Sequence, residues 1–166
     1  MKIYIYESDN PKKYSANFFA DAFLKYTGKS FIPTDYPLLP RDKNGKPNPI
    51  MLPDKKLLHF SISHSGKYWG IAFNSKPIGF DLETKLKQGK PREFSTKFLQ
   101  KILTKDETLI ENSPLHNFVA KEAYSKLTGE GLSLGFSKID ANELIKQYHP
   151  YSLEDDQLIL YAFATK

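Results

Sequence analysis

The chain has 166 residues, of which 40% are apolar and 26% are charged, a composition that fits a globular protein and excludes a disordered or fibrous one. It contains no cysteine, which excludes disulfides, cysteine-ligated zinc and thiol catalysis. No segment approaches the roughly 18 apolar residues of a membrane span, and the N-terminus lacks the pattern of a signal peptide. We therefore expect a cytoplasmic protein without a membrane partner.

The formal net charge of +5 is concentrated in the first half of the chain. Residues 1–83 carry 12 basic and 8 acidic side chains, whereas residues 84–166 carry 12 and 11. An excess of positive charge suits an anionic partner, such as a phosphate-bearing ligand, an acidic protein or nucleic acid, but it also serves solubility alone. The charge narrows the class of partner without selecting one.

The first half is predicted to contain a strand, a helix and a long loop before a group of strands. Residues 3–6 alternate like a strand, and residues 14–26 carry aromatic side chains at helical spacing, with Gly28 just past the end. Residues 31–53 contain six prolines and are predicted to form an extended loop, whose length favours a binding role. An antiparallel meander is predicted from the strands at residues 59–63, 69–74 and 78–83.

The second half is predicted to begin with helices and to end in strands. Residues 91–102 form the first predicted helix, and a second opens at Thr104, which forms a capping box with Glu107. A Ser-Pro start and a closing glycine delimit a third helix over residues 113–127. The tail is predicted to contain strands at residues 136–139 and 157–163. Each half thus pairs helix with antiparallel sheet.

Two carboxylates mark the strand predicted at residues 78–83. Side chains alternate along a strand, so Asp81 and Glu83 share one face while Phe80 and Leu82 point to the core. Carboxylates roughly 7 Å apart repel each other unless a cation lies between them. Mg²⁺ is the natural candidate, because it prefers oxygen ligands and keeps waters that a phosphate can replace. The alternative is a solvated strand end with two surface acids.

Two further patterns could bind phosphate or metal. Glu122 and Lys126 lie one helical turn apart, and they could bind a metal and a phosphate, or form an exposed ion pair worth a few tenths of a kcal/mol. The turn at residues 61–67 gathers hydroxyls, an imidazole and a lysine that could bind a phosphate dianion, or serve only as a hydrophilic turn. His64 without a cysteine partner is a poor zinc ligand, and Gly45-Lys46-Pro47 alone is a turn with one cation.

Four segments in this order resemble the 4′-phosphopantetheinyl transferase family, of the surfactin-synthetase-activating type. None of them is decisive alone, but together they span residues 41–139 and account for the long loop, the paired acids and the Glu–Lys pair. The segments are Gly45-Lys46-Pro47, residues 60–66 (Phe-Ser-Ile-Ser-His-Ser-Gly), residues 78–83 (Ile-Gly-Phe-Asp-Leu-Glu) and residues 121–132 (Lys-Glu-Ala-Tyr-Ser-Lys-Leu-x-Gly-x-Gly-Leu).

The resemblance implies an α+β pseudo-dimer, in which two similar halves at residues 1–83 and 84–166 each pack a small antiparallel sheet with helix about a pseudo-twofold axis. Coenzyme A would bind in the cleft between the halves, and the fused pseudo-dimer would be a monomer. Three carboxylates would hold Mg²⁺ against the coenzyme A pyrophosphate: Asp81, Glu83 and Glu122. Four side chains would bind coenzyme A: Lys126 at the pyrophosphate, Ser63 and His64 at the nucleotide end with His64 near the 3′-phosphate, and Lys46 near the adenine and phosphates.

The implied reaction transfers 4′-phosphopantetheine from coenzyme A to a serine of an apo acyl or peptidyl carrier protein and releases adenosine 3′,5′-bisphosphate. Positioning and charge neutralisation dominate such a transfer, here by Mg²⁺ and Lys126, and Glu122 is the candidate base for the serine proton. One alternative is a degenerate coenzyme A-binding module or partner subunit, which the retained acids and Lys126 disfavour. Another is a nucleic-acid-binding domain, which the scattered basic residues and lack of a recognition motif disfavour.

The chain also departs from the family pattern. Phe118 or Val119 stands where the family usually has a tryptophan. The Arg-rich helix that would grip the 3′-phosphate is not found, and Lys12 and Lys13 are the available substitutes. Glu107 falls where the family has an acidic residue near the site, although a capping box already explains it.

Overall fold

The structure is a computed structural model that describes residues 1–87, 89–130 and 135–165. A four-stranded antiparallel sheet has the order β1 (Lys2–Glu7), β4 (Tyr68–Asn74), β3 (Leu57–Ser65) and β2 (Ile50–Met51). A three-stranded antiparallel sheet has the order β5 (Ile78–Thr84), β9 (Leu158–Ala164) and β8 (Tyr151–Glu154), and β6 (Leu86–Lys87) pairs with β7 (Lys90–Pro91). The helices are α1 (Ser15–Thr27), α2 (Thr96–Ile102), α3 (Pro114–Thr128) and α4 (Ala141–Tyr148), with short 3₁₀ segments η1 (Pro33–Leu38), η2 (Ile110–Asn112) and η4 (Phe136–Lys138).

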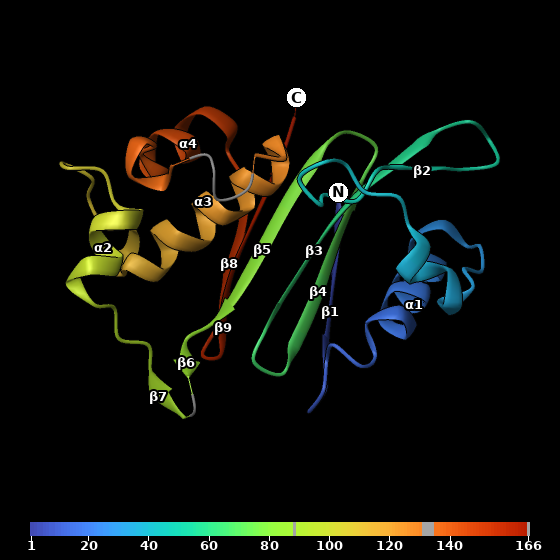
Figure 1. The fold of residues 1–166 in the computed structure, drawn as a ribbon, viewed down its shortest axis with the longest axis horizontal. Coiled ribbons are helices and arrows are strands. Elements are labelled where there is room, and N and C mark those ends of the chain that lie inside the picture. The colour runs from blue at the N-terminus through green and yellow to red at the C-terminus, as the bar shows by residue number, and fades with distance from the viewer. Residues whose placement is uncertain (88, 131–134, 166) are drawn as a thin grey trace.

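The two main sheets lie side by side between helices, with α1 at one end of the molecule and α2, α3 and α4 at the other (Figure 1). An aromatic cluster joins α1 to the first sheet, and a second apolar cluster joins α3 and α4 to the second sheet. A third cluster, which includes Ala72 of the first sheet and Phe80 and Leu160 of the second, lies between the sheets. Each sheet therefore buries one face against helix and the other against its neighbour. The predicted α+β architecture of small antiparallel sheets packed with helices is confirmed.

Serine hydroxyls connect β3 to β5 where the two sheets meet. Ser61, Ser63 and Ser65 alternate along β3 and therefore point to the same side. Ser61 Oγ accepts a hydrogen bond from Phe80 N at 3.0 Å, and Ser63 Oγ donates to Asp81 Oδ1 at 2.6 Å. β5 pairs with β9 at its other edge, so these serine side chains provide hydrogen bonds to β5 at the edge that faces β3. They also place Asp81 at the junction of the two sheets.

The elements predicted for the first half are present, but their pairing differs from the prediction. The predicted strands and the helix that ends at Gly28 correspond to β1, α1, β3, β4 and β5. The meander is wrong beyond β4, because β4 already lies between β1 and β3 and β5 pairs with β9. Residues 78–83, assigned to the N-terminal half from the sequence, thus belong to the second sheet. The long loop also contains η1 and the two residues of β2.

The second half confirms the central helix and corrects its surroundings. Ser113 caps α3 by accepting a hydrogen bond from Leu115 N at 3.3 Å, and Gly129 ends the helix in the left-handed conformation, as predicted. The helix predicted from residue 91 begins only after Ser95. The helix predicted to open at Thr104 is wrong, because residues 104–109 form a turn and irregular chain that leads into η2, where Glu111 has positive φ.

The helix α4 replaces a predicted strand. The strand expected at residues 136–139 is wrong, since this segment forms η4 and leads into α4. Asp140 caps α4 by accepting a hydrogen bond from Asn142 N at 2.8 Å. An Asp-x-x-Glu pattern from Asp140 to Glu143, ahead of the buried Leu144, was the available signal for this helix.

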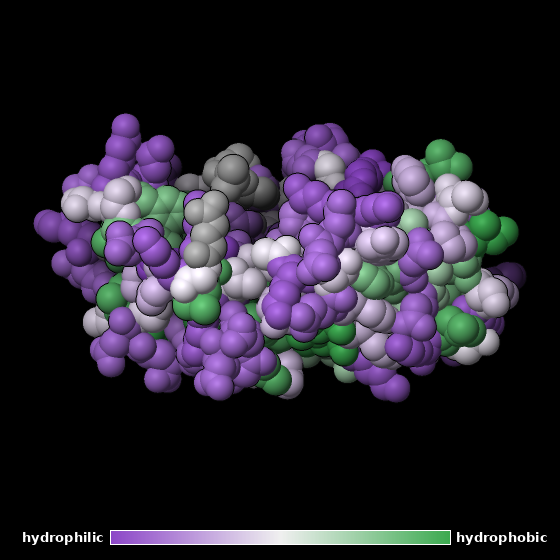
Figure 2. All heavy atoms as spheres, turned by 90° about the horizontal axis from the view of Figure 1, so that it is seen from below, coloured by the Kyte–Doolittle hydropathy of each residue, from purple (hydrophilic) through white to green (hydrophobic). Residues whose placement is uncertain are grey.

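The surface seen from the lower end of Figure 1 is mostly hydrophilic over both halves, and apolar side chains gather mainly at the end occupied by α1 (Figure 2). Among the described residues, the helices are all too short or too polar to cross a bilayer.

Candidate active site

The acidic residues of β5 and α3 face one another across a small cavity. This cavity, of about 290 Å³, is called the acid cavity here. The structure brings six of the seven candidate site residues to it, and only Lys46 lies elsewhere. The six are Ser63, His64, Asp81, Glu83, Glu122 and Lys126.

A glycine allows α3 to approach β5 closely enough to form this cavity. A Cβ atom on Gly79 would lie 2.1 Å from Ala123 O and 2.2 Å from Leu127 N, both in the backbone of α3. Any larger residue would therefore push the helix away from the strand. Gly79 thus sets the distance between the carboxylate of Asp81, two residues along β5, and the side chains of α3.

Asp81 is buried, with only 4% of the residue exposed, so it is not part of a solvated strand end. Its Oδ1 atom accepts hydrogen bonds from Ser63 Oγ and Lys126 Nζ, both at 2.6 Å. Its Oδ2 atom is buried and has no hydrogen-bond partner among the described residues. An unpaired buried carboxylate oxygen is energetically unfavourable, and it fits a site where a cation binds.

Glu122 and Lys126 act separately rather than as an exposed helix pair. Lys126 Nζ donates to Asp81 Oδ1 and to Ile62 O, the latter at 3.3 Å, and these are its hydrogen bonds within the described chain. Burial, followed by the charge of Asp81, raises the pKa of Glu122 to about 7, although Lys126 opposes the shift. Glu122 is therefore a carboxyl group that readily takes up a proton or a cation near neutral pH.

Glu83 has a cationic partner that the sequence did not indicate. Its Oε2 atom accepts hydrogen bonds from Ser65 Oγ and from Arg92, which follows the β6–β7 hairpin. Burial raises the pKa of Glu83, while Ser65 and Arg92 oppose the rise. Over residues 1–87, 89–130 and 135–165, no three acidic or histidine residues are grouped as a ready-made metal site. Arg92 occupies no recognisable motif, so sequence reasoning missed it.

A larger, basic cavity of about 420 Å³ adjoins the acid cavity, and Ile62, His64 and Lys126 line both. None of the described residues that line it is acidic, whereas Lys12, Arg41, Lys46 and Lys126 supply cationic groups. Ser63, expected near a nucleotide, lines the acid cavity, and its hydroxyl donates a hydrogen bond to Asp81. The basic cavity can accommodate an anionic ligand that extends toward the acidic side chains.

The long loop attaches to the end of α3 through the Gly-Lys-Pro motif. Lys46 Nζ donates to Leu127 O at 2.6 Å, and Asn44 Nδ2 donates to Gly129 O at 2.7 Å. These contacts satisfy carbonyl groups at the C-terminal end of the helix, where positive charge is favourable. The loop is therefore part of the basic cavity and not a free turn. Gly131 and Leu132, the last residues of the matching motif, lie outside the described residues.

His64 lies where the two cavities meet. Burial, followed by the nearby charge of Lys12, lowers the pKa of His64 below its usual value. The imidazole is thus neutral at pH 7 and can be protonated if an anion binds beside it. Of the two proposed substitutes for the missing arginines, Lys12 lines the basic cavity, whereas Lys13 lies over the ring of Tyr14 at 5.4 Å.

Comparison with known proteins gives a family for the part of the chain that contains β5 and α3. Residues 77–158 match the family model of the 4′-phosphopantetheinyl transferase superfamily. This part of the chain belongs to that superfamily. The match contains β5 and α3, and with them Asp81, Glu83, Glu122 and Lys126. The resemblance inferred from the sequence motifs is therefore confirmed.

Curated relatives carry the same family name. The 4′-phosphopantetheinyl transferase Sfp of Bacillus subtilis (strain 168) is 42% identical over 97 residues, which cover 54% of this chain and 40% of Sfp. The 4′-phosphopantetheinyl transferase psf-1 of Bacillus pumilus is 32% identical over 117 residues, 66% of this chain and 47% of psf-1. The chain thus spans less than half the length of these relatives.

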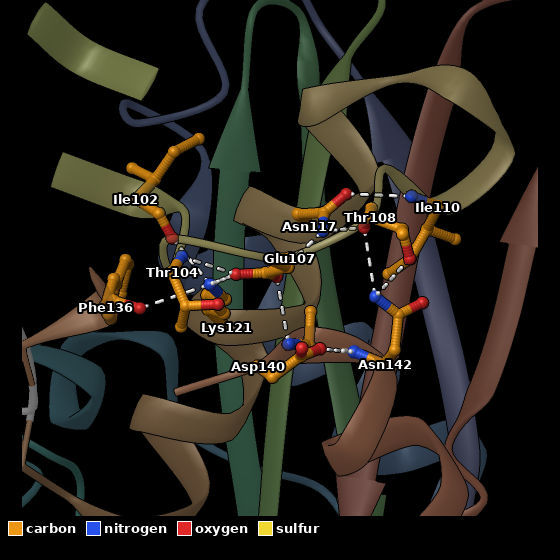
Figure 3. Close-up of polar contacts among 11 residues, drawn as sticks. Ile102, Thr104, Glu107, Thr108, Ile110, Asn117, Lys121, Phe136, Asp140 and Asn142 are labelled. Carbon is orange, nitrogen blue, oxygen red and sulfur yellow. Dashed lines mark hydrogen bonds and ion pairs between the residues drawn. The ribbon is translucent and has the colours of Figure 1, made fainter. Parts of the chain in front are cut away.

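Glu107, which the resemblance led us to expect near the site, lies outside both cavities. Thr104 N donates to Glu107 Oε2 at 2.8 Å, so one arm of the predicted capping box forms. The same oxygen accepts a hydrogen bond from Lys121 Nζ, and both side chains are fully buried (Figure 3). Glu107 is therefore a structural residue that is buried against α3. The predicted capping box accounted for its bond to Thr104 but not for its ion pair with Lys121.

The pKa of Glu122 predicts how pH affects the stability of the metal-free protein. Between the unfolded pKa near 4.5 and the folded pKa of about 7, the folded state binds more protons than the unfolded state, so stability falls as pH rises through this window. Glu122→Gln removes this dependence. Relative to the wild type, its melting temperature in EDTA should therefore rise between pH 5 and pH 8. A constant difference across this range would contradict the assigned pKa.

Proposed function

We propose that this protein transfers the 4′-phosphopantetheine group of coenzyme A to a serine of an apo acyl or peptidyl carrier protein, with Mg²⁺ and with release of adenosine 3′,5′-bisphosphate. One observation carries the proposal: Asp81, Glu122 and Lys126 meet in one cavity within the region that matches the superfamily, next to a basic cavity. The basic cavity is lined by both halves of the chain, which supports a pseudo-dimeric arrangement with coenzyme A between them.

The acid cavity fits a divalent cation. Asp81 offers the unpaired Oδ2 atom, and Glu122 offers a carboxyl group whose proton a cation can replace. Glu83 would be the third ligand once it is released from Arg92. When bound, Mg²⁺ would neutralise charge on the pyrophosphate of coenzyme A.

The side chains around the cation site have separate tasks in the transfer. Lys126 exchanges its contact with Asp81 for a phosphate oxygen, which neutralises charge that builds up as the bond breaks. The carrier serine attacks the β-phosphate in line, and Glu122 is the candidate base that accepts the serine proton. Ser63 contributes by holding Asp81 in place.

The basic cavity suits the nucleotide end of coenzyme A. Lys46, fixed at the end of α3, would lie near the adenine and phosphates, and His64 near the 3′-phosphate. A net charge of +5 would favour the approach of an acidic carrier protein. A monomeric, cytoplasmic enzyme is part of the same proposal.

Intact mass spectrometry tests the reaction directly. The protein is incubated with coenzyme A, Mg²⁺ and a panel of apo carriers, and one carrier should gain the mass of one phosphopantetheine. The alternative is a module that binds coenzyme A without transferring part of it. It is supported by the basic cavity, whose cationic side chains could bind an anion without catalysing any reaction. Coenzyme A binding in calorimetry with no mass gain on any carrier would favour that alternative.

His64→Ala should weaken the binding of coenzyme A more than that of dephospho-coenzyme A, which lacks the 3′-phosphate. A hydrogen bond to a charged group is worth about 1.5–3 kcal/mol, so we expect the two affinities to fall by amounts that differ about tenfold or more. Isothermal titration calorimetry with both ligands measures this difference. Equal losses for the two ligands would show that His64 does not contact the 3′-phosphate.

A further inference from the structure

Arg92 connects the β6–β7 hairpin to both main sheets beside the acid cavity. Its Nε atom donates to Thr84 O at 2.7 Å, and its Nη2 atom donates to Ser65 Oγ at 3.0 Å and to Glu83 Oε2. The hairpin continues directly from the lower end of β5 (Figure 1), so Arg92 returns to the strand that carries Glu83. The Arg92 and Glu83 side chains are only 24% and 19% exposed, which limits solvent screening of the pair.

The contacts of Arg92 separate Glu83 from the other two acids. Asp81 keeps an unpaired buried oxygen, and the Glu122 carboxylate lines the same cavity without a hydrogen bond or an ion pair to the described residues, so both remain available to a cation. Glu83 and Asp81 each have a cation and a hydroxyl donor on one oxygen, but among the described residues only Asp81 also keeps a second oxygen that is buried and without a partner. The three carboxylates therefore differ in their availability, although the sequence pattern treats them alike.

We infer that Arg92 is a positioning residue that competes with the divalent cation for Glu83, so that Asp81 and Glu122 bind the cation first and Glu83 joins only when Arg92 releases it. This inference rests on the proposed function for the identity of the cation site. The exchange needs no backbone opening, because the bond from Arg92 to Thr84 O does not involve Glu83 and can persist when the ion pair breaks. Arg92 thereby lowers cation affinity in the absence of substrate.

A double-mutant cycle on cation binding tests the competition. Mn²⁺, used as a spectroscopic substitute for Mg²⁺, is titrated by electron paramagnetic resonance without coenzyme A or carrier, into wild type, Arg92→Gln, Glu83→Gln and the double variant. Arg92→Gln should tighten Mn²⁺ binding about tenfold, because one positive charge is lost and one carboxylate is freed. Glu83→Gln alone should change the affinity little, whereas in the Arg92→Gln background it should abolish the gain.

Lys90→Gln is the matched control, because Lys90 is an exposed cation on the same hairpin that makes no contact with Glu83 within the described part of the chain. It should leave Mn²⁺ affinity nearly unchanged. Circular dichroism confirms that each variant is folded, and Arg92→Lys, which retains the charge, provides a second variant with a smaller expected gain if Arg92→Gln is unstable.

Several outcomes would overturn the inference. If Glu83→Gln weakened Mn²⁺ binding equally in both backgrounds, Glu83 would be a cation ligand whether or not Arg92 is present. If it changed Mn²⁺ affinity in neither background, Arg92 would not act on the cation through Glu83. The absence of Mn²⁺ binding in every variant would overturn it as well. The transfer assay by mass spectrometry is a separate measurement. If the effects of the two substitutions on Mn²⁺ affinity are coupled but no carrier is modified, only the proposed function is rejected. If a carrier is modified but the two effects are independent, only the role of Arg92 is rejected.

Discussion

Asp81→Asn should lower the rate of phosphopantetheine transfer by about two to three orders of magnitude, the loss typical of removing one preorganised electrostatic contact to a transition state. The change preserves the shape of the side chain and a hydrogen bond with Ser63, but it removes the charge that pairs with Lys126 and the oxygen that has no partner. Asparagine is preferable to alanine because Asp81 is buried, and truncation would also leave a cavity.

The measurement is the initial rate of carrier modification over a range of Mg²⁺ concentrations. If Asp81 binds the cation, the rate of the variant should remain low when Mg²⁺ is saturating. Ser63→Ala is the graded companion, because it removes one of the two donors to Asp81 Oδ1 and leaves the charge. Its loss should be clearly smaller. Near-normal turnover of Asp81→Asn at saturating Mg²⁺ would remove Asp81 from the site.

Local patterns predicted the parts of this site well. The alternation along β5 correctly placed Phe80 and Leu82 in the core and set Asp81 apart from them, and the Ser-Pro start and Gly129 correctly bounded α3. Such signals depend on neighbours within a few residues, which the sequence displays directly.

Contacts between residues far apart in the sequence could not be predicted in this way. β5 pairs with β9, some 75 residues later, because β1 occupies the edge of β4 that a meander would use. The alternation of β5 is identical in either pairing, so periodicity cannot select the partner. The ion pair between Arg92 and Glu83 likewise depends on how the β6–β7 hairpin folds back, which no motif specifies.

The local sequence pattern predicted one hydrogen bond of Glu107 correctly but gave no sign of its buried ion pair with a distant residue. The Thr-x-x-Glu pattern did produce the hydrogen bond from Thr104 N, but the carboxylate is also the partner of Lys121. Asn117 Nδ2 and Ala141 N donate to its other oxygen, at 2.8 and 3.0 Å. A buried cation on α3 could not be recognised from a Lys-Glu-Ala sequence, because Lys121 precedes Glu122 and either residue could have faced the interior.

Lys121→Met should destabilise the protein by about 3–5 kcal/mol, the range expected when one partner of a buried ion pair is removed. Both side chains are 0% exposed, so Glu107 would be left charged and without a cation in the interior. Lys121 Nζ also donates to Ile102 O at 2.6 Å and to Phe136 O at 3.1 Å (Figure 3), and methionine cannot satisfy these carbonyl groups.

Urea unfolding followed by circular dichroism measures the loss, and Lys146→Met is the matched control. Lys146 also pairs with a glutamate, Glu143, but the two side chains are 72% and 68% exposed, so this substitution should change stability little. Replacing both buried partners, by Lys121→Met with Glu107→Leu, should not restore full stability. The backbone N–H groups of Thr104 and Ala141 would then lose their acceptor. A double variant as stable as the wild type would show that the pair contributes no more than apolar packing would.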